Sequence, residues 1–391
     1  MGKKNNSRKV FFDEKKAVKV FKDLSAAYRG KHGIFNDVVL PQSRWPPDEE
    51  KSLIKDDREM ANWLLLVALP MRGGIISEEP FKVWWDMRKT LPNLFDFELV
   101  AKEWTPAAIE RQLKRILRRR RKENGGASNE DEEVVGYKIK EHANSWYQNA
   151  VVMHQRWGND ARNIFKGVND FEQAFARVDY RRNKEGLRGM RRKIFSLFTI
   201  WLQEGGLIPV FPTPIPVDFH ALRVFWATGI IVNNDWEEPY QPKPGQPEQL
   251  SGKLAIRVTE SFIDQIAVWS QEFLVKNGFS HLVVNPAVWF LSRTLCAESF
   301  QNSSRKNGHL FFEAEDLKTN PHLWPKQYRN PCLYCPIEKY CHWAIPAGPY
   351  YRWGVLIRIG ERLAYPQRAL SFPDDFWKKV SYVKSRKNQS S

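Results

Sequence analysis

The chain has 391 residues, of which 42% are hydrophobic and 13% aromatic, enough for a packed core in two domains or one large composite domain. Lys and Arg number 61 against 45 Asp and Glu, so the formal net charge is +16. That excess favours nucleic acid as partner, with an anionic membrane surface or a purely solubilising role as alternatives. No apolar run approaches a transmembrane span, and residues 1–22 lack a signal peptide's apolar stretch. We therefore expect a folded protein of the reducing cytoplasm with no membrane partner.

Hydrophobic periodicity predicts a mostly α-helical fold. Apolar residues recur at helical spacing from Met60 to Leu69, and the turn residues Pro70–Gly74 then end the pattern. Strand signals are few, although Leu356 and its neighbours in the tail fit a short hairpin. Further helices are predicted at residues 80–90, 106–117, 138–153, 169–178, 193–204, from 218 onward, 254–277 and 286–296.

Two segments interrupt the helical pattern. The basic run Arg118–Lys122 leads into acidic and Gly-rich residues, a composition that cannot bury apolar surface. Residues 118–136 are therefore predicted to form a disordered insertion. Four prolines between residues 209 and 216 predict an extended connection, because each fixes its own φ and biases the preceding residue away from helix.

Four cysteines form the most specific pattern in the sequence. Two residues separate Cys332 from Cys335 and five separate Cys335 from Cys341, while Cys296 stands alone upstream. Crowded thiols in a reducing compartment are more typical of metal ligands than of disulfides. Zinc sites usually pair two short cysteine hooks, so a lone cysteine with a compact triplet favours a four-iron cluster, with zinc as the alternative.

Two further motifs carry candidate chemistry. Asp218 follows the proline-rich connection at the start of a predicted helix, where an aspartate serves as N-cap and complements the helix dipole. Upstream, residues 185–194 form a glycine-containing basic turn that leads into a helix. Backbone N–H groups at such a turn can bind phosphate, although a solvated basic loop explains the same residues.

Taken in chain order, these motifs resemble the helix-hairpin-helix (HhH-GPD) DNA glycosylase superfamily, over roughly residues 59–341. The likeness is to its endonuclease III and adenine-mismatch branch, which carries an iron–sulfur cluster. The cysteine spacings x2 and x5 match, as does Arg293-Thr294-Leu295-Cys296 at the end of the preceding helix. The sequence departs from the family at Arg188, Arg191 and Phe219, which replace a proline, a glycine and a threonine. The other matches are Leu187, Gly189, Met190, Arg192 and Lys193 in the hairpin, and Val217, Asp218, His220, Arg223 and Val224 downstream.

The resemblance implies a mostly α, two-domain helical fold, in which a six-helix barrel accompanies a cluster-bearing helical domain and the active cleft lies between them. The N-terminal arm would pack on the cluster domain. The implied divisions are an arm at 1–52, the barrel at 53–205 with the insertion at 118–136, the cluster domain at 206–345, and a C-terminal extension at 346–391.

The same resemblance implies a monomeric, nucleoid-associated enzyme of base-excision repair, which removes a damaged or mispaired base from double-stranded DNA. Asp218 would stabilise the positive sugar, and attack by Lys193 on the sugar would add AP lyase activity. A [4Fe-4S] cluster, or zinc, would bind Cys296, Cys332, Cys335 and Cys341. The implied DNA contacts are Arg188, Gly189, Arg191, Arg192, His220 and, as the wedge that replaces the flipped base, Arg72.

Two other interpretations remain. The altered hairpin favours a non-catalytic DNA-binding protein that retains the glycosylase scaffold and metal cluster. An iron–sulfur nuclease with one early and three late cysteines is disfavoured, because the Asp…Glu-x-Lys metal site that such enzymes carry on paired strands is not found between the predicted helices.

Overall fold

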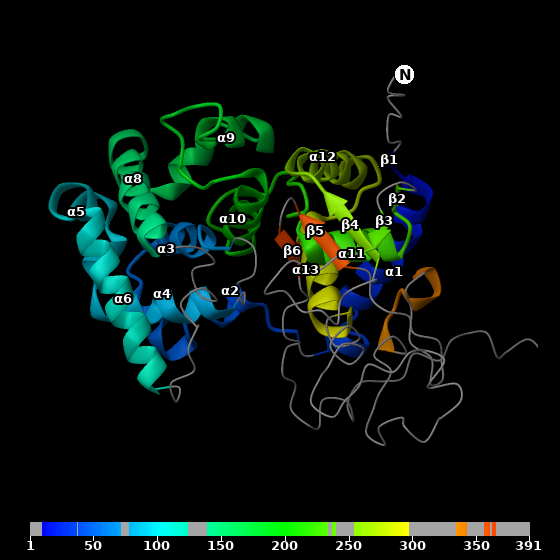
Figure 1. Cartoon of the computed structure of the whole chain (residues 1–391), viewed down its shortest axis with the longest axis horizontal. Helices are drawn as coiled ribbons and strands as arrows, with labels where there is room; N and C mark the ends of the chain where they lie inside the picture. The colour runs from blue at the N-terminus through cyan, green and yellow to red at the C-terminus, as the bar shows by residue number, and fades with distance from the viewer. Residues whose placement is uncertain are drawn as a thin grey trace, which may run out of the picture. The chain divides into compact units, whose positions relative to one another are not determined.

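The computed structural model describes residues 10–36, 38–71, 78–123, 139–233, 237–239, 254–296, 334–341, 356–359 and 362–364 (Figure 1). The chain divides into two compact units. Unit 1 comprises Met1–Val38 and Val217–Ser391, and unit 2 comprises Val39–Pro216. The protein is mostly helical, as predicted. Within the described ranges, no helix is long and apolar enough to cross a membrane.

Unit 1 is built from both ends of the chain. Strand β1 pairs antiparallel with β2, and Phe11 lies opposite Val232. The elements are β1 (Val10–Phe12), α1 (Glu14–Arg29), η1 (Gly33–Phe35), α11 (Phe219–Ala227), β2 (Ile231–Asn233), β3 (Glu237–Pro239), β4 (Leu254–Val258), α12 (Glu260–Lys276), α13 (His281–Leu291), the π-helix η6 (Ser292–Cys296), η9 (Glu338–Tyr340), β5 (Leu356–Ile359) and β6 (Arg362–Ala364).

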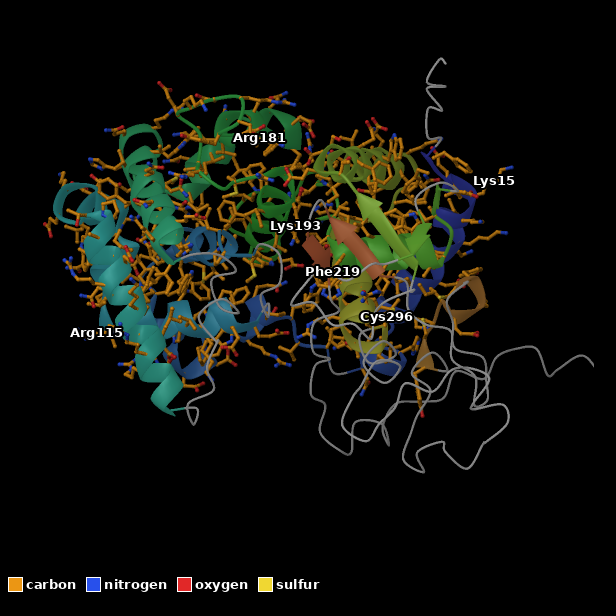
Figure 2. The ribbon with its side chains drawn as sticks, viewed as in Figure 1. Lys15, Arg115, Arg181, Lys193, Phe219 and Cys296 are labelled. Atoms are coloured by element: carbon orange, nitrogen blue, oxygen red, sulfur yellow. The ribbon has the colours of Figure 1, made fainter. Side chains whose placement is uncertain are left out.

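An aromatic cluster holds the N-terminal arm to the later helices of unit 1. Phe21 of α1 lies 5.9 Å from Phe225 of α11 and 5.6 Å from Phe273 of α12, measured between ring centroids. Helix α1 also packs on α13. Its opposite face is polar and includes exposed Lys15 (Figure 2). The amphipathic pattern of α1 therefore fixes which side faces the core.

The small sheet of unit 1 corrects one sequence prediction and confirms another. A helix was expected from residue 254, but Leu254–Val258 forms β4, and α12 begins only after Thr259, whose hydroxyl accepts from the Phe262 N–H at 3.3 Å. Strands follow the order β3-β4-β5-β6, with β4 and β5 parallel. The antiparallel β5–β6 pair confirms the hairpin predicted in the tail.

Unit 2 holds most of the predicted helices. Helix α6 runs on to Glu123, so the prediction of disorder from residue 118 is wrong for its first six positions. The remaining insertion residues, 124–136, lie outside the described part of the chain. The elements are α2 (Pro41–Arg44), η2 (Asp48–Leu53), α3 (Asp57–Ala68), α4 (Glu78–Thr90), η3 (Pro92–Phe95), α5 (Phe97–Glu103), α6 (Pro106–Glu123), α8 (Ile139–Trp157), η4 (Ala161–Phe165), α9 (Phe171–Val178) and α10 (Arg192–Glu204).

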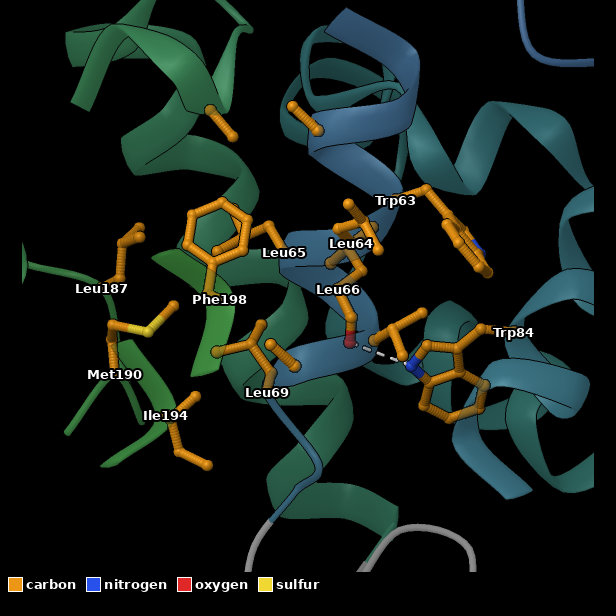
Figure 3. Close-up of a cluster of buried hydrophobic side chains, with 14 of the residues drawn as sticks. Trp63, Leu64, Leu65, Leu66, Leu69, Trp84, Leu187, Met190, Ile194 and Phe198 are labelled. Atoms are coloured by element: carbon orange, nitrogen blue, oxygen red, sulfur yellow. Dashed lines mark hydrogen bonds between the residues drawn. The ribbon is translucent and has the colours of Figure 1, made fainter. Parts of the chain in front are cut away.

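Helix α3 forms the centre of unit 2. Every residue from Ala61 to Ala68 is buried, the pattern of a helix that is surrounded on all sides. Figure 3 shows Ile194 and Phe198 of α10 on one side of α3 and Trp84 of α4 on the other. The Trp84 indole N–H donates to the Leu66 carbonyl at 3.0 Å, which satisfies its buried polar atom. Helix α10, which follows the predicted hairpin, is thus held by the core.

We expect unit 1 to lose stability in mild acid because of His281. This side chain is 6% exposed, and burial lowers its pKa from 6.5 to about 4. The unfolded chain takes up a proton near pH 6.5 and the folded chain does not, so stability present above pH 6.5 is lost as the pH falls towards 4. The loss should reach on the order of 3 kcal/mol.

Urea denaturation in neutral and mildly acidic buffer measures this effect, and hydrogen exchange of α13 assigns it to unit 1. His281→Gln should remove the histidine component. His32→Gln alters an exposed histidine of the same unit and should leave the acid sensitivity unchanged. Equal acid sensitivity in both variants would contradict the assignment.

Candidate functional site

The predicted hairpin connects α9 to α10 in unit 2. Asp170 caps α9 by accepting from the Gln173 N–H at 3.0 Å. After α9, Asp179 forms an isolated parallel bridge with Leu187, whose N–H donates to the Val178 carbonyl at 2.9 Å. The connection is thus a closed loop whose two ends lie side by side.

Close backbone approach requires a glycine inside this loop. A Cβ added to Gly186 would lie 2.6 Å from the Val178 carbonyl oxygen and 2.8 Å from the Tyr180 nitrogen. Both neighbours are backbone atoms and have little room to move. The sequence pattern predicted a glycine-containing turn. The backbone atoms that lie close to Gly186 explain why residue 186 is glycine, because they leave no room for a Cβ.

A side chain of α8 fixes the turn at Arg188. The Asn149 carboxamide accepts from the Arg188 N–H at 2.6 Å and donates to the Arg188 carbonyl at 3.0 Å. Asn149 is 1% exposed, so these bonds form in a dry environment. Gly189 follows with φ of 90°, a conformation that other residues rarely adopt.

The N-terminus of α10 offers backbone donors beside the turn. Its N-cap residue is Arg191, whose side chain makes no capping hydrogen bond. The first N–H groups of a helix have no partner within the helix, and together with the helix dipole they attract anions. The exposed Arg191 side chain adds positive charge at this end. The arrangement is suited to phosphate.

Three further cations of the loop were missed by sequence analysis: Arg181, Arg182 and Lys184, all exposed. Figure 2 shows Arg181 on the connection between α9 and α10. Asp179, which is 1% exposed, lies 3.3 Å from the Arg181 guanidinium and 3.6 Å from that of Arg182. One carboxylate thus faces two arginines, which leaves the loop basic. The run Tyr180-Arg181-Arg182-Asn183-Lys184 was the available signal.

Arg192 and Lys193 occupy partly or fully enclosed positions. Arg192 is 6% exposed, forms an ion pair with Glu172 of α9, and lies over the Phe175 ring at 4.9 Å. It therefore braces α9 against α10 inside unit 2. The half-buried Lys193 donates from Nζ to the Met71 carbonyl at 3.2 Å, next to the end of α3.

Asp218 caps α11 in unit 1, as its position in the sequence predicts. Its Oδ1 accepts from the N–H groups of His220 at 2.8 Å and Ala221 at 3.2 Å. The carboxylate is half-buried, so its orientation is fixed while part of it reaches the surface. His220 is 1% exposed, and its Nδ1 lies 3.2 Å from the Ser292 hydroxyl. This histidine belongs to the interior of unit 1.

Arg223, one turn beyond Asp218, is the most unusual polar group of unit 1. It is 4% exposed, and none of its three guanidinium nitrogens has a hydrogen-bond partner in the described part of the chain. Burial lowers its pKa, and the nearby Cys296 thiol and Asp218 carboxylate act in the opposite direction. A buried cation without acceptors is costly unless an anion lies beside it.

A cysteine-bound cluster would supply that anion. Thiolates bind metals in their charged form, so four of them around a four-iron cluster or a zinc ion leave net negative charge. Figure 2 shows Cys296 in unit 1, at the end of the π-helix that follows α13. Arg223 beside Cys296 is compatible with added negative charge at this position, although the three described cysteines, Cys296, Cys335 and Cys341, form no group that could hold a metal ion.

The second cysteine segment is anchored on α1 of the same unit. Asp23 accepts from the Tyr340 hydroxyl at 2.9 Å and pairs with Lys339 at 2.8 Å. Burial would raise the pKa of Asp23, but the hydrogen bonds from Lys339 and Tyr340 outweigh it and the pKa is lowered. The ion pair thus holds the segment that carries Cys335 and Cys341, both partly exposed.

The predicted site residues fall into two groups. Asp218, His220, Cys296, Cys335 and Cys341 belong to unit 1, and the hairpin residues belong to unit 2. Arg72 and Cys332 lie outside the described residues. Among the residues that are described, no three His, Cys, Asp or Glu side chains form a group that could hold a metal ion.

Comparison of the sequence with protein-family models gives no match, and comparison with curated proteins gives none either.

We expect Asn149→Ala to loosen the hairpin. The substitution leaves the Arg188 N–H and carbonyl without their partner, which should lower the free energy of unfolding of unit 2 by about 2 kcal/mol. Asn144→Ala is the control, because the partly exposed Asn144 lies on the same helix and donates to the Lys140 carbonyl one turn earlier, at 2.9 Å. Urea denaturation and hydrogen exchange of residues 187–190 measure both. Identical behaviour of the two variants would refute the role of Asn149.

The anion beside Arg223 can be tested by replacing that residue with Met. With a metal–thiolate group present, Arg223→Met should weaken metal retention roughly 10- to 100-fold, as seen for groups around metal ligands. Iron and zinc are measured per chain after chelator treatment. Arg29→Met, at the exposed end of α1, is the control. If no anion lies there, removal of the buried charge should instead stabilise the protein without changing its metal content.

Proposed function

We propose that the protein is a DNA glycosylase of base-excision repair, which cleaves the N-glycosidic bond of a damaged or mispaired base in double-stranded DNA. The observation that carries the proposal is the Asp218 carboxylate, held half-exposed by two backbone N–H groups. The likeness of its surroundings to the helix-hairpin-helix glycosylases supports it. We propose that unit 2 has the six-helix barrel fold of these enzymes and that unit 1 is their cluster-bearing domain.

The carboxylate suits the charge that this reaction develops. When the bond between C1′ and the base breaks, its electron pair leaves with the base and the sugar becomes positively charged. A fixed carboxylate stabilises that charge without having to reorient. Water then adds to C1′ through its oxygen and releases a proton. In this proposal Asp218 stabilises the positive sugar and orients the attacking water.

Lys193 of unit 2 is the proposed nucleophile of an AP lyase step. Attack by its neutral amine on C1′ forms a carbon–nitrogen bond as the base leaves, and loss of a proton from nitrogen gives an aminal. The C1′–O4′ bond then breaks, O4′ takes up a proton, and the opened sugar is left as a protonated Schiff base. Elimination from that species cuts the strand, which is AP lyase activity. The amine must first lose its proton, and desolvation or neighbouring cations favour that loss.

The hairpin is the proposed DNA contact. The side chains of Arg188 and Arg191 and the N–H groups at the start of α10 would bind backbone phosphates, and the extended loop adds Arg181, Arg182 and Lys184. These contacts would help to offset the few kcal/mol needed to take a base out of the stack. Arg192, which pairs with Glu172, would position the helix behind them.

A metal–thiolate group is part of the proposal. Cys296, Cys335 and Cys341, with Cys332, would hold a four-iron cluster or zinc, and Arg223 would neutralise part of its charge. Such a group supplies a covalent link between α13 and the later cysteine segment. The partner in this proposal is double-stranded DNA, bound by a monomer in the cytoplasm.

A non-catalytic DNA-binding protein is the second candidate. It is favoured by Arg188 and Arg191 in the hairpin and by Lys193, whose amine donates to the Met71 carbonyl. Such a protein would use the same basic loop without base release. The two candidates differ in the role of Asp218.

Asp218→Asn separates them. Asparagine caps a helix as well as aspartate does, so α11 should remain folded while the negative charge is lost. An enzyme should lose at least about 100-fold in excision rate, a transition-state effect of about 3 kcal/mol, and should keep its DNA affinity. Base release from a panel of lesion and mismatch duplexes is measured alongside binding.

Asp170→Asn is the matched control, because Asp170 caps α9 in the same way. Borohydride trapping of the wild-type protein on DNA, lost in Lys193→Gln, would support the lyase step. Failure of the wild-type protein to release any base from the panel, with DNA binding intact, would favour the non-catalytic candidate.

A further inference from the structure

Helix α6 buries one face and presents the opposite one to solvent. Its apolar side chains face the core of unit 2, and the helix packs along α8. This stripe explains why α6 is helical and how it is oriented. The buried members are Ile109, Leu113, Ile116 and Leu117.

The outer face of α6 is a continuous stripe of cations. Its five basic side chains recur at helical spacings of three and four residues, so they share one side of the helix. All are exposed. Figure 2 shows Arg115 on the side of α6 away from the other helices of unit 2. The basic stripe, as we name it, comprises Arg111, Lys114, Arg115, Arg118 and Arg119.

Little negative charge accompanies the basic stripe. Glu110 pairs with Lys114 at 2.6 Å. In the part of unit 2 that is described, no carboxylate forms an ion pair with Arg111, Arg115 or Arg118. Like charges four residues apart, such as Arg111 and Arg115, destabilise a helix by a few tenths of a kcal/mol. The stripe therefore does not serve the stability of α6.

Other exposed lysines of unit 2 are arranged differently. Lys51 pairs with Asp48 at 2.5 Å, Lys55 lies 4.0 Å from Glu59, and Lys102 pairs with Glu98 at 2.5 Å. These three lysines therefore differ from Arg111, Arg115 and Arg118 of the stripe, which form no ion pair within the described residues. Four of the five stripe residues are arginines, whose planar guanidinium binds phosphate through two parallel hydrogen bonds.

We propose that the basic stripe of α6 binds the phosphate backbone of double-stranded DNA as a second contact surface, separate from the hairpin. From Arg111 to Arg119 the helix rises about 12 Å, which spans three or four phosphates of one strand. A membrane surface fits less well, because the apolar face that would enter the lipid is buried against α8. The inference shares its partner with the proposed function but rests on α6 alone and does not require catalysis.

The test compares two triple variants of the full chain. Arg111→Gln/Arg115→Gln/Arg118→Gln removes unpaired cations of the stripe. Lys51→Gln/Lys55→Gln/Lys102→Gln removes the same charge from paired positions of the same unit. All six side chains are exposed, so circular dichroism should show both variants folded.

Fluorescence anisotropy with an undamaged duplex of three helical turns measures affinity between about 50 and 200 mM salt. The stripe variant should reduce the slope of log affinity against log salt by up to about 2.7, because each lost phosphate contact contributes about 0.9. It should also bind at least about tenfold more weakly at low salt. The paired-lysine control should keep the wild-type slope.

Each other outcome has a defined meaning. Equal slopes in the two variants would overturn the stripe proposal. Binding of the wild-type protein to anionic lipid vesicles, but not to the duplex, would overturn it too. Stripe-dependent DNA binding without any base release would support the stripe while the glycosylase proposal fails. Unaltered DNA binding by the stripe variant, with base release intact, would overturn the stripe proposal and support the glycosylase proposal.

Discussion

The pairing of β1 with β2 is the constraint on which unit 1 depends. It joins residues near the N-terminus to residues beyond 230, and the Phe21, Phe225 and Phe273 rings continue the contact into the helices. The loop so closed is long, but the entropic cost of closure grows only logarithmically with length. Burial of aromatic surface at 25 cal/mol per Å2 readily offsets that cost. The elements carrying Asp218 and the described cysteines all belong to the unit closed in this way.

Charge is distributed in two distinct ways across the chain. In unit 1, Arg223 is a buried cation without a hydrogen-bond partner in the described part of the chain, and the Asp218 carboxylate and Cys296 lie near it. In unit 2, cations are exposed on the hairpin loop and on α6, where a flexible, solvated polyanion can reach them. The buried arrangement in unit 1 suits a permanently bound group, and the exposed arrangement in unit 2 suits a partner that binds reversibly.

Apolar periodicity predicted most of the long helices, because it records which face is buried, but it gave no prediction of α1 (Glu14–Arg29). Sequence patterns failed at Leu254–Val258, where a short run with three large aliphatic side chains fits strand or helix and pairing with β5 decides the outcome. They also failed at the end of α6, where composition indicated disorder although helix formation continues through the arginines to Glu123. Helical propensity outweighed charge repulsion there.

Site residues were predictable to the extent that their role depends on local chain chemistry. Asp218 was placed as a cap because capping needs only neighbouring backbone. The enclosure of Arg192 and His220 depends on Glu172 and Ser292, which lie far along the sequence and leave no local signal. Asn149 was missed for the same reason: its 39-residue separation from Arg188 is invisible to any periodicity.

The contact between Asn149 and Arg188 also bears on the residue type at position 188. A proline there would stiffen the turn through its ring but would have no N–H for Asn149 to accept. Covalent and hydrogen-bonded rigidity are thus mutually exclusive at this position, so in this chain the shape of the turn depends on α8. Because Asn149 bonds to the backbone of residue 188, proline is the residue type that this contact excludes there.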